Sequence, residues 1–168
     1  LNAENGKVQI DLREGNFSKV GDYQFSDIFT NNGIIKNGLA IWTNKNLQTS
    51  QLGNLELINR LELHSADLNN DININKAKNI DFYSSGSFVN NMGNILAATD
   101  KIYIHAGSLQ NDGEIAAQDK LLATGAYELI SMDGFINNGL ISSGIGASSI
   151  KVNNGNLSNN LVALSPDQ

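Results

Sequence analysis

The segment Phe88-Val-Asn-Asn-Met-Gly-Asn-Ile-Leu-Ala-Ala-Thr-Asp-Lys-Ile-Tyr-Ile104 is followed by a second copy of the same pattern, Leu109-Gln-Asn-Asp-Gly-Glu-Ile-Ala-Ala-Gln-Asp-Lys-Leu-Leu122. Each copy begins with an apolar residue, places Asn two positions later, passes through a turn with Gly and ends in a second apolar stretch. The apolar stretches are short and alternate apolar with polar residues, which is typical of β-strands. One unit is therefore predicted to be strand, Asn/Gly turn, strand and polar turn, with Gly supplying the positive φ of a tight turn.

The apolar residue that starts each unit recurs along most of the chain, at steps of 18, 21, 20, 21, 26 and 22 residues. The residues of this first column are Phe29, Leu47, Leu68, Phe88, Leu109, Phe135 and Leu157. Asn stands two positions after each of them, except after Leu47, where Thr49 takes its place. A second column within the same units consists of Leu39, Leu61, Ile80, Ile102, Leu121 and Ile150. Two columns that share one period indicate a structural repeat.

Repeats of this length with only short strands cannot bury an apolar face alone, and they therefore have to stack. The sequence predicts an all-β fold, a right-handed parallel β-helix (β-solenoid) of about seven turns with roughly 20-residue repeats. The recurring Asn residues are expected to form a ladder, in which each side-chain amide bonds the copies above and below. The predicted ladder residues are Asn70, Asn90, Asn111, Asn137 and Asn159.

Two parts of the chain depart from the repeat. Residues 1–28 fit the columns poorly and are expected to form irregular first turns or an end cap, whereas residues 29–168 form the β-helix. The 26-residue step from Leu109 to Phe135 is longer than the other steps, and its extra residues predict an inserted loop at residues 122–133. Insertions in solenoids project from one face, and binding often uses such projections. A neutral surface loop is the preferred interpretation of this segment, and a binding projection is the alternative, for which Tyr127 and Glu128 are the candidate residues.

The composition excludes several classes of function. The chain of 168 residues has a net charge of −6, which does not suit a nucleic-acid-binding protein. It has no Cys, and so neither disulfides nor zinc–thiolate sites can form. It contains 26 Asn and 16 Gly, which disfavours long helices. No apolar run reaches the roughly 18 residues that a membrane span requires.

The ionisable residues give no clear active site or metal site. Asp100 and Asp119 are expected at equivalent positions one turn apart, where the alternatives to a solvated position are a general base or calcium bound between these two residues and Asp81. Each of the first two is followed by Lys, however, which is typical of a solvated repeat position. His64 and His105 are 41 residues apart, which places them two turns apart and too far to share a metal. We therefore predict no catalytic residue, no metal and no cofactor.

Three aromatic residues follow the strands of the second column. Trp42, Tyr83 and Tyr103 occupy similar places in successive units. Packing between turns is the preferred interpretation, and stacking on sugar rings at the surface is the alternative.

The two units quoted above resemble the repeats of filamentous haemagglutinin. In that family the motif apolar-x-Asn-x-Gly-x-Ile-x-Ala is followed by a second apolar strand. The resemblance is close over residues 60–122, looser over 29–60 and 130–160, and absent over 1–28. The long unit and Thr49 depart from the motif, which affects local regularity.

The resemblance implies a rigid repeat segment of a large bacterial exoprotein of the two-partner secretion kind. Such a protein leaves the cell with an outer-membrane secretion partner and is located at the cell surface, as an adhesin or as the stalk of a contact-dependent growth inhibition effector. We therefore expect a non-enzymatic structural and interaction module that meets a receptor or glycan on a host or neighbouring cell. The alternative is a carbohydrate-active or carbohydrate-binding parallel β-helix, which would gather unmatched acidic, basic and aromatic residues in one groove.

Overall fold

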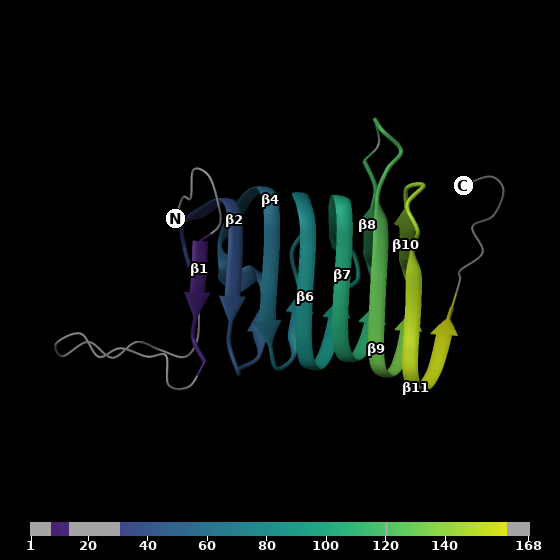
Figure 1. The fold of residues 1–168 in the computed structure, drawn as a ribbon. Helices are drawn as coiled ribbons and strands as arrows, with labels where there is room; N and C mark the ends of the chain where they lie inside the picture. Colours follow the sequence, from purple (N-terminus) through teal and green to yellow (C-terminus); the bar gives the residue numbers. More distant parts are fainter. Residues whose placement is uncertain (1–7, 14–30, 120, 161–168) are drawn as a thin grey trace.

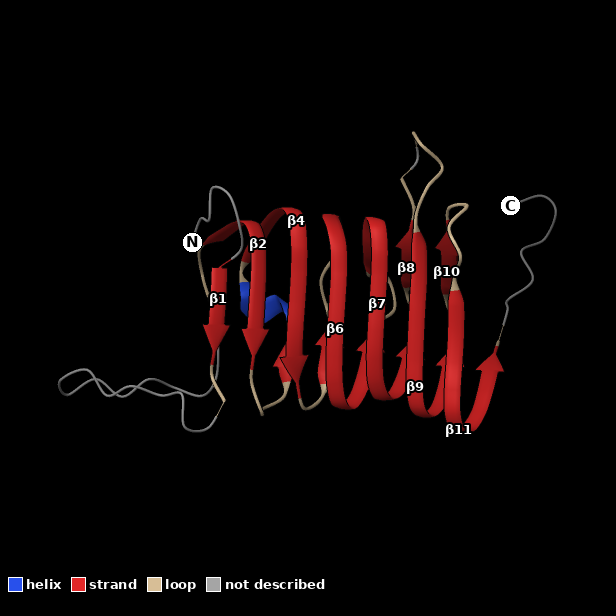
Figure 2. Ribbon diagram, in the orientation of Figure 1, coloured by secondary structure: helices blue, strands red, loops and turns tan. Residues whose placement is uncertain are grey.

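The computed structural model describes residues 8–13, 31–119 and 121–160, which form a right-handed parallel β-helix of about six turns. Figures 1 and 2 show strands stacked side by side along a rod, and Figure 2 marks the short helical turn in blue. The strands are β1 (Val8–Asp11), β2 (Ile34–Trp42), β3 (Leu47–Gln48), β4 (Asn54–Ser65), β5 (Leu68–Asn70), β6 (Ile74–Asn90), β7 (Ile95–Asn111), β8 (Glu114–Ala117), β9 (Ala126–Asn137), β10 (Leu140–Ser143) and β11 (Ser149–Asn159). The helical turn is η1 (Thr49–Leu52). The predicted all-β class and parallel β-helix are confirmed, with about six turns among the described residues where the sequence predicts about seven.

Each turn of the β-helix contributes to three faces, and every strand pairing is parallel. The first face contains the second apolar column of the sequence, and on it the strands follow the order β1, β2, β4, β6, β7, β9, β11. The second face contains the first column and its Asn residues, and the third contains β8, β10 and the beginnings of β6 and β7. Strands as long as β6 and β7 run over all three faces because they bend at the corners.

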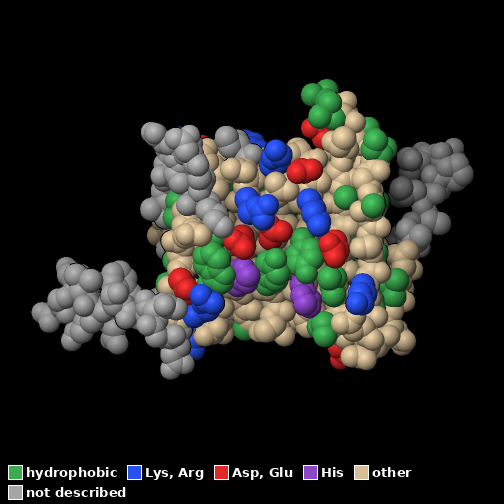
Figure 3. Space-filling view, in the orientation of Figure 1, with side chains coloured by type: hydrophobic (Ala, Val, Ile, Leu, Met, Phe, Trp, Pro, Cys, Tyr) green, Lys and Arg blue, Asp and Glu red, His purple; other side chains and the backbone are tan. Residues whose placement is uncertain are grey.

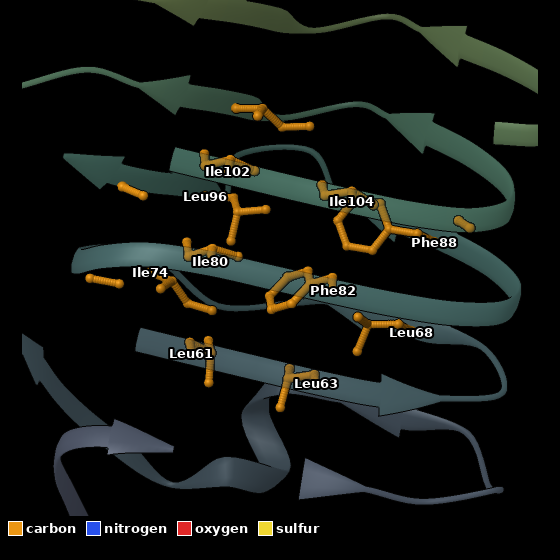
Figure 4. Packing of buried hydrophobic residues seen from close by; sticks show 14 of the residues in the cluster. Leu61, Leu63, Leu68, Ile74, Ile80, Phe82, Phe88, Leu96, Ile102 and Ile104 are labelled. Atoms are coloured by element: carbon orange, nitrogen blue, oxygen red, sulfur yellow. The ribbon is translucent and has the colours of Figure 1, made fainter. Parts of the chain in front are cut away.

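The interior is filled by the apolar columns. Leu61, Ile80 and Ile102 lie one above another on the first face with none of their surface exposed (Figure 4). On the second face, the register confirms the predicted first column from its second member onward, at Leu47, Leu68, Phe88, Leu109, Phe135 and Leu157. Its predicted first member, Phe29, lies outside the described residues. Full burial of a Leu, Ile or Phe side chain contributes about 1.5–3 kcal/mol. The stacked columns are therefore the main source of stability.

Asparagine side chains form a hydrogen-bonded row inside the second face, the asparagine ladder. Its members are Asn70, Asn90, Asn111, Asn137 and Asn159. At every step the Nδ2 group donates to the Oδ1 atom of the next asparagine at 2.8 Å. Thr49 precedes the row and donates its hydroxyl to Asn70 Oδ1, also at 2.8 Å. The row links successive turns through side chains in addition to the backbone.

The ladder position requires asparagine because it needs a donor and an acceptor on one buried side chain. Asn111 is fully buried and accepts from Asn90 below while it donates to Asn137 above. Its Nδ2 group also reaches the backbone oxygens of Gly113 at 3.3 Å and Leu140 at 3.2 Å. An ionised carboxylate can only accept hydrogen bonds, and an apolar side chain would leave buried neighbours unsatisfied.

The glycines of the Asn-x-Gly turns are needed for a reason that differs from the predicted one. Gly93 has the expected positive φ, at 82°, but Gly113 and Gly139 do not. A Cβ atom on Gly139 would lie 1.9 Å from the backbone oxygen of Gly113, and one on Gly113 would lie 2.3 Å from that of Asn94. At these two positions glycine is required because successive turns approach too closely to admit a side chain.

We expect Gly139→Ala to lower the free energy of unfolding by about 1–3 kcal/mol, because the methyl group forces two backbone segments apart. Gly33→Ala is the matched control, since its Cβ would meet only Asn31 Oδ1 at an ordinary 3.6 Å. Urea denaturation of both variants measures the difference. Equal midpoints would mean that the turns can separate without cost.

The described residues 118–119 and 121–125 form the loop between β8 and β9, whereas residues 126–133 of the predicted loop, 122–133, belong to strand β9. The loop projects from the rod between β8 and β9 (Figure 1). Leu121 and Leu122 in the loop are 96% and 69% exposed. Their backbone N–H groups donate to Asp119 Oδ1 at 2.9 and 3.1 Å, which bends the chain locally.

The position of this loop also corrects the second apolar column. Leu121 was predicted to continue the column above Ile102, but the register places Tyr127 there. Ile150 lies above Leu129, two residues further along the strand than predicted. The second column therefore continues from Ile102 to Tyr127, after the loop, because β9 begins at residue 126.

The first 28 residues are described only in part. Residues 8–11 form β1, which pairs in parallel with β2 and so extends the first face by one strand. Residues 1–7 and 14–28 lie outside the described residues, and the predicted end cap therefore stays a prediction.

Candidate functional site

Outward side chains on the first face form an aromatic row, which consists of Trp42, His64, Tyr83 and Tyr103. The rings of Trp42 and His64 stack with their centroids 5.3 Å apart, and those of His64 and Tyr83 stack at 4.3 Å with an interplanar angle of 5°. Tyr103 continues the row at 5.4 Å from Tyr83 with a tilted ring. The strand spacing of about 4.8 Å is close to these separations. These aromatic side chains thus pack between turns, as the preferred interpretation has it, but they do so on the outside of the rod.

A charged row lies beside the aromatic row on the same strands. Arg60 Nη1 is 2.5 Å from Asp81 Oδ2, and Lys101 Nζ is 3.2 Å from Glu128 Oε2. Figure 3 shows acidic and basic side chains mixed on this face, next to both histidines. Exposed ion pairs of this kind contribute only about 0–1 kcal/mol to stability. Their main effect is to balance the charge of the face.

The two tyrosines of the aromatic row have altered acidity. Partial burial raises the pKa of Tyr83 above its usual range, and the Asp81 carboxylate raises it further. Burial and then the Glu128 carboxylate raise the pKa of Tyr103 in the same way. Both phenols therefore stay protonated at neutral pH, and each can donate and accept hydrogen bonds.

The chain turns a corner just after the aromatic row, and small side chains at this corner leave a groove of about 540 Å³, the corner groove. Its lining includes Trp42, His64, Tyr83, His105, Ser85 and Gly107. Arg13 from the β1 end of the rod and Met132 from β9 also line it. Small-molecule sites typically occupy about 300–1,000 Å³. The corner groove is therefore large enough to hold a ligand.

The end of the groove at β1 has an ion pair that can be titrated. Arg13 Nε and Nη2 donate to the Asp11 carboxylate at 2.9 and 2.6 Å. This side-chain hydrogen bonding lowers the pKa of Asp11 from 3.8 to about 2. The pair stabilises the folded state at pH values above the ordinary carboxyl pKa of 3.8. This contribution is lost as the pH falls toward the lowered pKa of about 2.

Titration of the Asp11 carboxyl by NMR should give a midpoint well below that of an exposed Asp. In Arg13→Gln the midpoint should return toward 3.8. Lys36→Gln is the control, because its amine approaches Glu56 at 3.8 Å and belongs to a different ion pair. An Asp11 midpoint that is the same with and without Arg13 would contradict the bidentate contact.

The candidate binding residues of the sequence do not lie in the inserted loop. Tyr127 and Glu128 belong to β9, where Tyr127 packs partly buried against the core and Glu128 points outward in the charged row. The structure thus places Glu128 on the same face as the corner groove and leaves Tyr127 as a packing residue. The projecting loop presents Leu121 and Leu122 instead.

The acidic and histidine candidates are not brought together. Asp81 is paired with Arg60, and Asp119 bends the loop, whereas Asp100 lies before the first-face segment of β7. The described residues contain no group of three or more His, Asp or Glu side chains placed to hold a metal ion. His64 and His105 both line the corner groove, two rungs apart.

The corner residues were missed in the sequence. Asn44, Ser85 and Gly107 each lie two positions after an outward ring, and Arg13 lies at the equivalent position after β1. A usable signal was present, since a small or polar residue recurs at this place in successive units. It is weak because outward positions carry no hydrophobic pattern.

Compared with protein-family models, curated proteins and solved structures, the chain has no significant match in any of the three. No helix in the described part of the chain is long and apolar enough to cross a membrane.

Proposed function

We propose that this chain is a rigid repeat segment of a secreted bacterial exoprotein, of the kind that its repeats resemble, and that it mediates contact with other cells. The observation that carries the proposal is the asparagine ladder together with the buried columns. They join every described turn to the next, which makes a stiff rod. The outward positions remain available for a binding surface.

The architecture also suits the secretion route that the resemblance implies. In a stack of turns, each turn contacts only its neighbours, and so folding can proceed one turn at a time. A chain that emerges unfolded from an outer-membrane pore could then fold as it appears. The absence of Cys is compatible with this route. We propose the cell surface as the location, with an adhesin and a growth-inhibition stalk as the two possible parent proteins.

A carbohydrate-binding β-helix is the second candidate, and the corner groove favours it. The groove gathers aromatic and imidazole side chains from four successive strands. A carbohydrate-active enzyme is less well supported, because Asp81 and Glu128 on this face are ion-paired with Arg60 and Lys101. Catalytic carboxylates in glycosidases instead face each other across the scissile bond.

Attachment of protein-coated beads to cells tests the interaction role. We expect beads coated with this chain to attach to bacterial or epithelial cells, and soluble chain to compete for this attachment. Beads coated with the unfolded Ile102→Asp variant, discussed below, control for nonspecific adhesion. In parallel, pectin and glycosaminoglycan polymers are incubated with the chain and calcium. Attachment that soluble chain does not reduce, or reproducible cleavage of a polymer, would contradict the proposal.

A further inference from the structure

The corner groove repeats its chemistry once per turn along the rod axis. Trp42, His64, Tyr83 and His105 occupy equivalent positions on four successive strands. Parallel strands are about 4.8 Å apart, and so this part of the groove is about 14 Å long. A hexose unit in an extended β-linked chain has nearly the same repeat, whereas an extended peptide advances by only about 3.3 Å per residue. A β-linked glycan can therefore place one sugar unit at every turn, with the same hydroxyls facing the rod at every second turn, whereas the repeat of a peptide does not match the spacing of the turns.

The rings of the groove offer their edges more than their faces. Trp42, His64 and Tyr83 stack on one another, so that neighbouring rings cover much of each face. The polar groups of such rings lie on the ring edges, where His64 Nε2 already contacts Glu62 Oε1 at 3.3 Å and His105 Nε2 contacts Met132 Sδ at 3.4 Å. The Tyr83 hydroxyl, the Asn44 amide and the Ser85 hydroxyl complete the polar lining of the groove. This set of groups suits a ligand with many hydroxyls, which is bound by hydrogen bonds.

The charge of the surroundings favours a ligand without charge. The charged row beside the groove consists of opposite charges held in pairs. Arg13, which lines one end of the groove, is engaged by Asp11. The chain as a whole carries a net charge of −6, which repels polyanions.

We propose that the corner groove binds a linear, uncharged, β-linked glycan parallel to the rod axis, with one sugar unit for each turn. This inference rests on the interaction role proposed above and names a ligand for one face of the rod. Because four turns contribute equivalent ring residues, four sugar units fill the groove. Affinity should therefore rise with chain length up to the tetrasaccharide and change little beyond it.

Tryptophan fluorescence tests the proposal directly, because Trp42 is the single tryptophan of the chain and lines the groove. The probes are cello- and chito-oligosaccharides of two, four and six units, with a heparin hexasaccharide and an uncharged extended peptide for comparison. We expect a saturable change with the neutral oligosaccharides and about tenfold tighter binding of the tetrasaccharide than of the disaccharide, from the added hydrogen bonds.

A matched pair of variants on β6 locates the binding. Ser85→Phe fills the groove from an exposed corner position. It should weaken binding by about tenfold or more, because the bulky ring removes at least one sugar contact. Asn75→Phe introduces the same side chain at an exposed position on the third face and should leave binding unchanged. Melting temperatures of both variants show that each is folded.

Three results would overturn the glycan proposal. The first is no fluorescence change with neutral oligosaccharides up to their solubility limit. The second is tighter binding of the heparin hexasaccharide or the peptide than of the tetrasaccharide. The third is binding to Ser85→Phe that equals binding to the parent chain. Competable attachment of beads to cells would survive any of these results, and so failure here is distinguishable from failure of the interaction role.

Discussion

Replacing Ile102 with Asp is expected to abolish cooperative folding of the β-helix. Ile102 is fully buried between Ile80 in the preceding turn and Tyr127 in the next. The substitution removes an apolar side chain from the column and buries a carboxylate without a partner, which together cost about 5 kcal/mol or more. Because domains are stable by only about 5–15 kcal/mol in total, the loss approaches the whole stability.

Far-ultraviolet circular dichroism and urea denaturation measure this effect. The control is Ala97→Asp on the same strand, where Ala97 points outward between the buried residues Leu96 and Ala98. This variant should denature within about 0.5 kcal/mol of the parent. A soluble Ile102→Asp variant with the parent's spectrum and urea midpoint would place Ile102 outside the core.

Replacing Asn111 with Asp is expected to lower the free energy of unfolding by about 3–5 kcal/mol at neutral pH. The carboxylate can still accept from Asn90, but it can no longer donate to Asn137 Oδ1 or to the backbone oxygen of Leu140. The new carboxylate oxygen would then face three acceptor oxygens, those of Asn137, Leu140 and Gly113, in a buried site. The ladder would be broken at its centre.

The cost of Asn111→Asp should depend on pH. Burial of the new carboxyl among oxygen atoms raises its pKa above that of an exposed Asp, because the site disfavours the charged form. Stability therefore falls as the pH rises through the unfolded-state pKa toward the raised folded-state value. The variant should come closest to the parent in acid, where the protonated carboxyl can donate one of the lost hydrogen bonds.

Urea denaturation at several pH values measures both effects. Asn153→Asp is the control, because Asn153 is exposed on β11, and its substitution should cost less than about 0.5 kcal/mol. If Asn111→Asp matched this control at neutral pH, the ladder would contribute nothing to the stability of the interior.

The repeat pattern predicted the columns well where burial and hydrogen bonding both constrain a residue. Phe88 and Leu109 lie in register as their spacing indicates, and two residues later Asn90 and Asn111 are hydrogen-bonded. Such a position admits few residue types, because it must fill the interior or satisfy buried partners. The constraint recurs in every turn, and it is therefore visible as a period.

The pattern failed where two segments are equally apolar. Leu121 and Tyr127 both fit the second column by type, and only the pairing of Lys101 with Ala126 shows which of them lies inside. The loop before β9 shifts the register, and no local propensity marks the shift. For the same reason the repeat pattern places Tyr127 and Glu128 in the loop, whereas the structure places them in strand β9.

The amino-acid sequence by itself determined the β-helix, its period and its asparagine ladder, because inward positions obey the same packing and hydrogen-bonding rule in each turn. Only the tertiary structure decided which outward residues meet. The corner groove joins Trp42, Tyr83 and His105 with small corner residues from turns some twenty residues apart. Outward side chains are free to vary, and their proximity follows from register and corner geometry, which the chain acquires only once its turns have stacked.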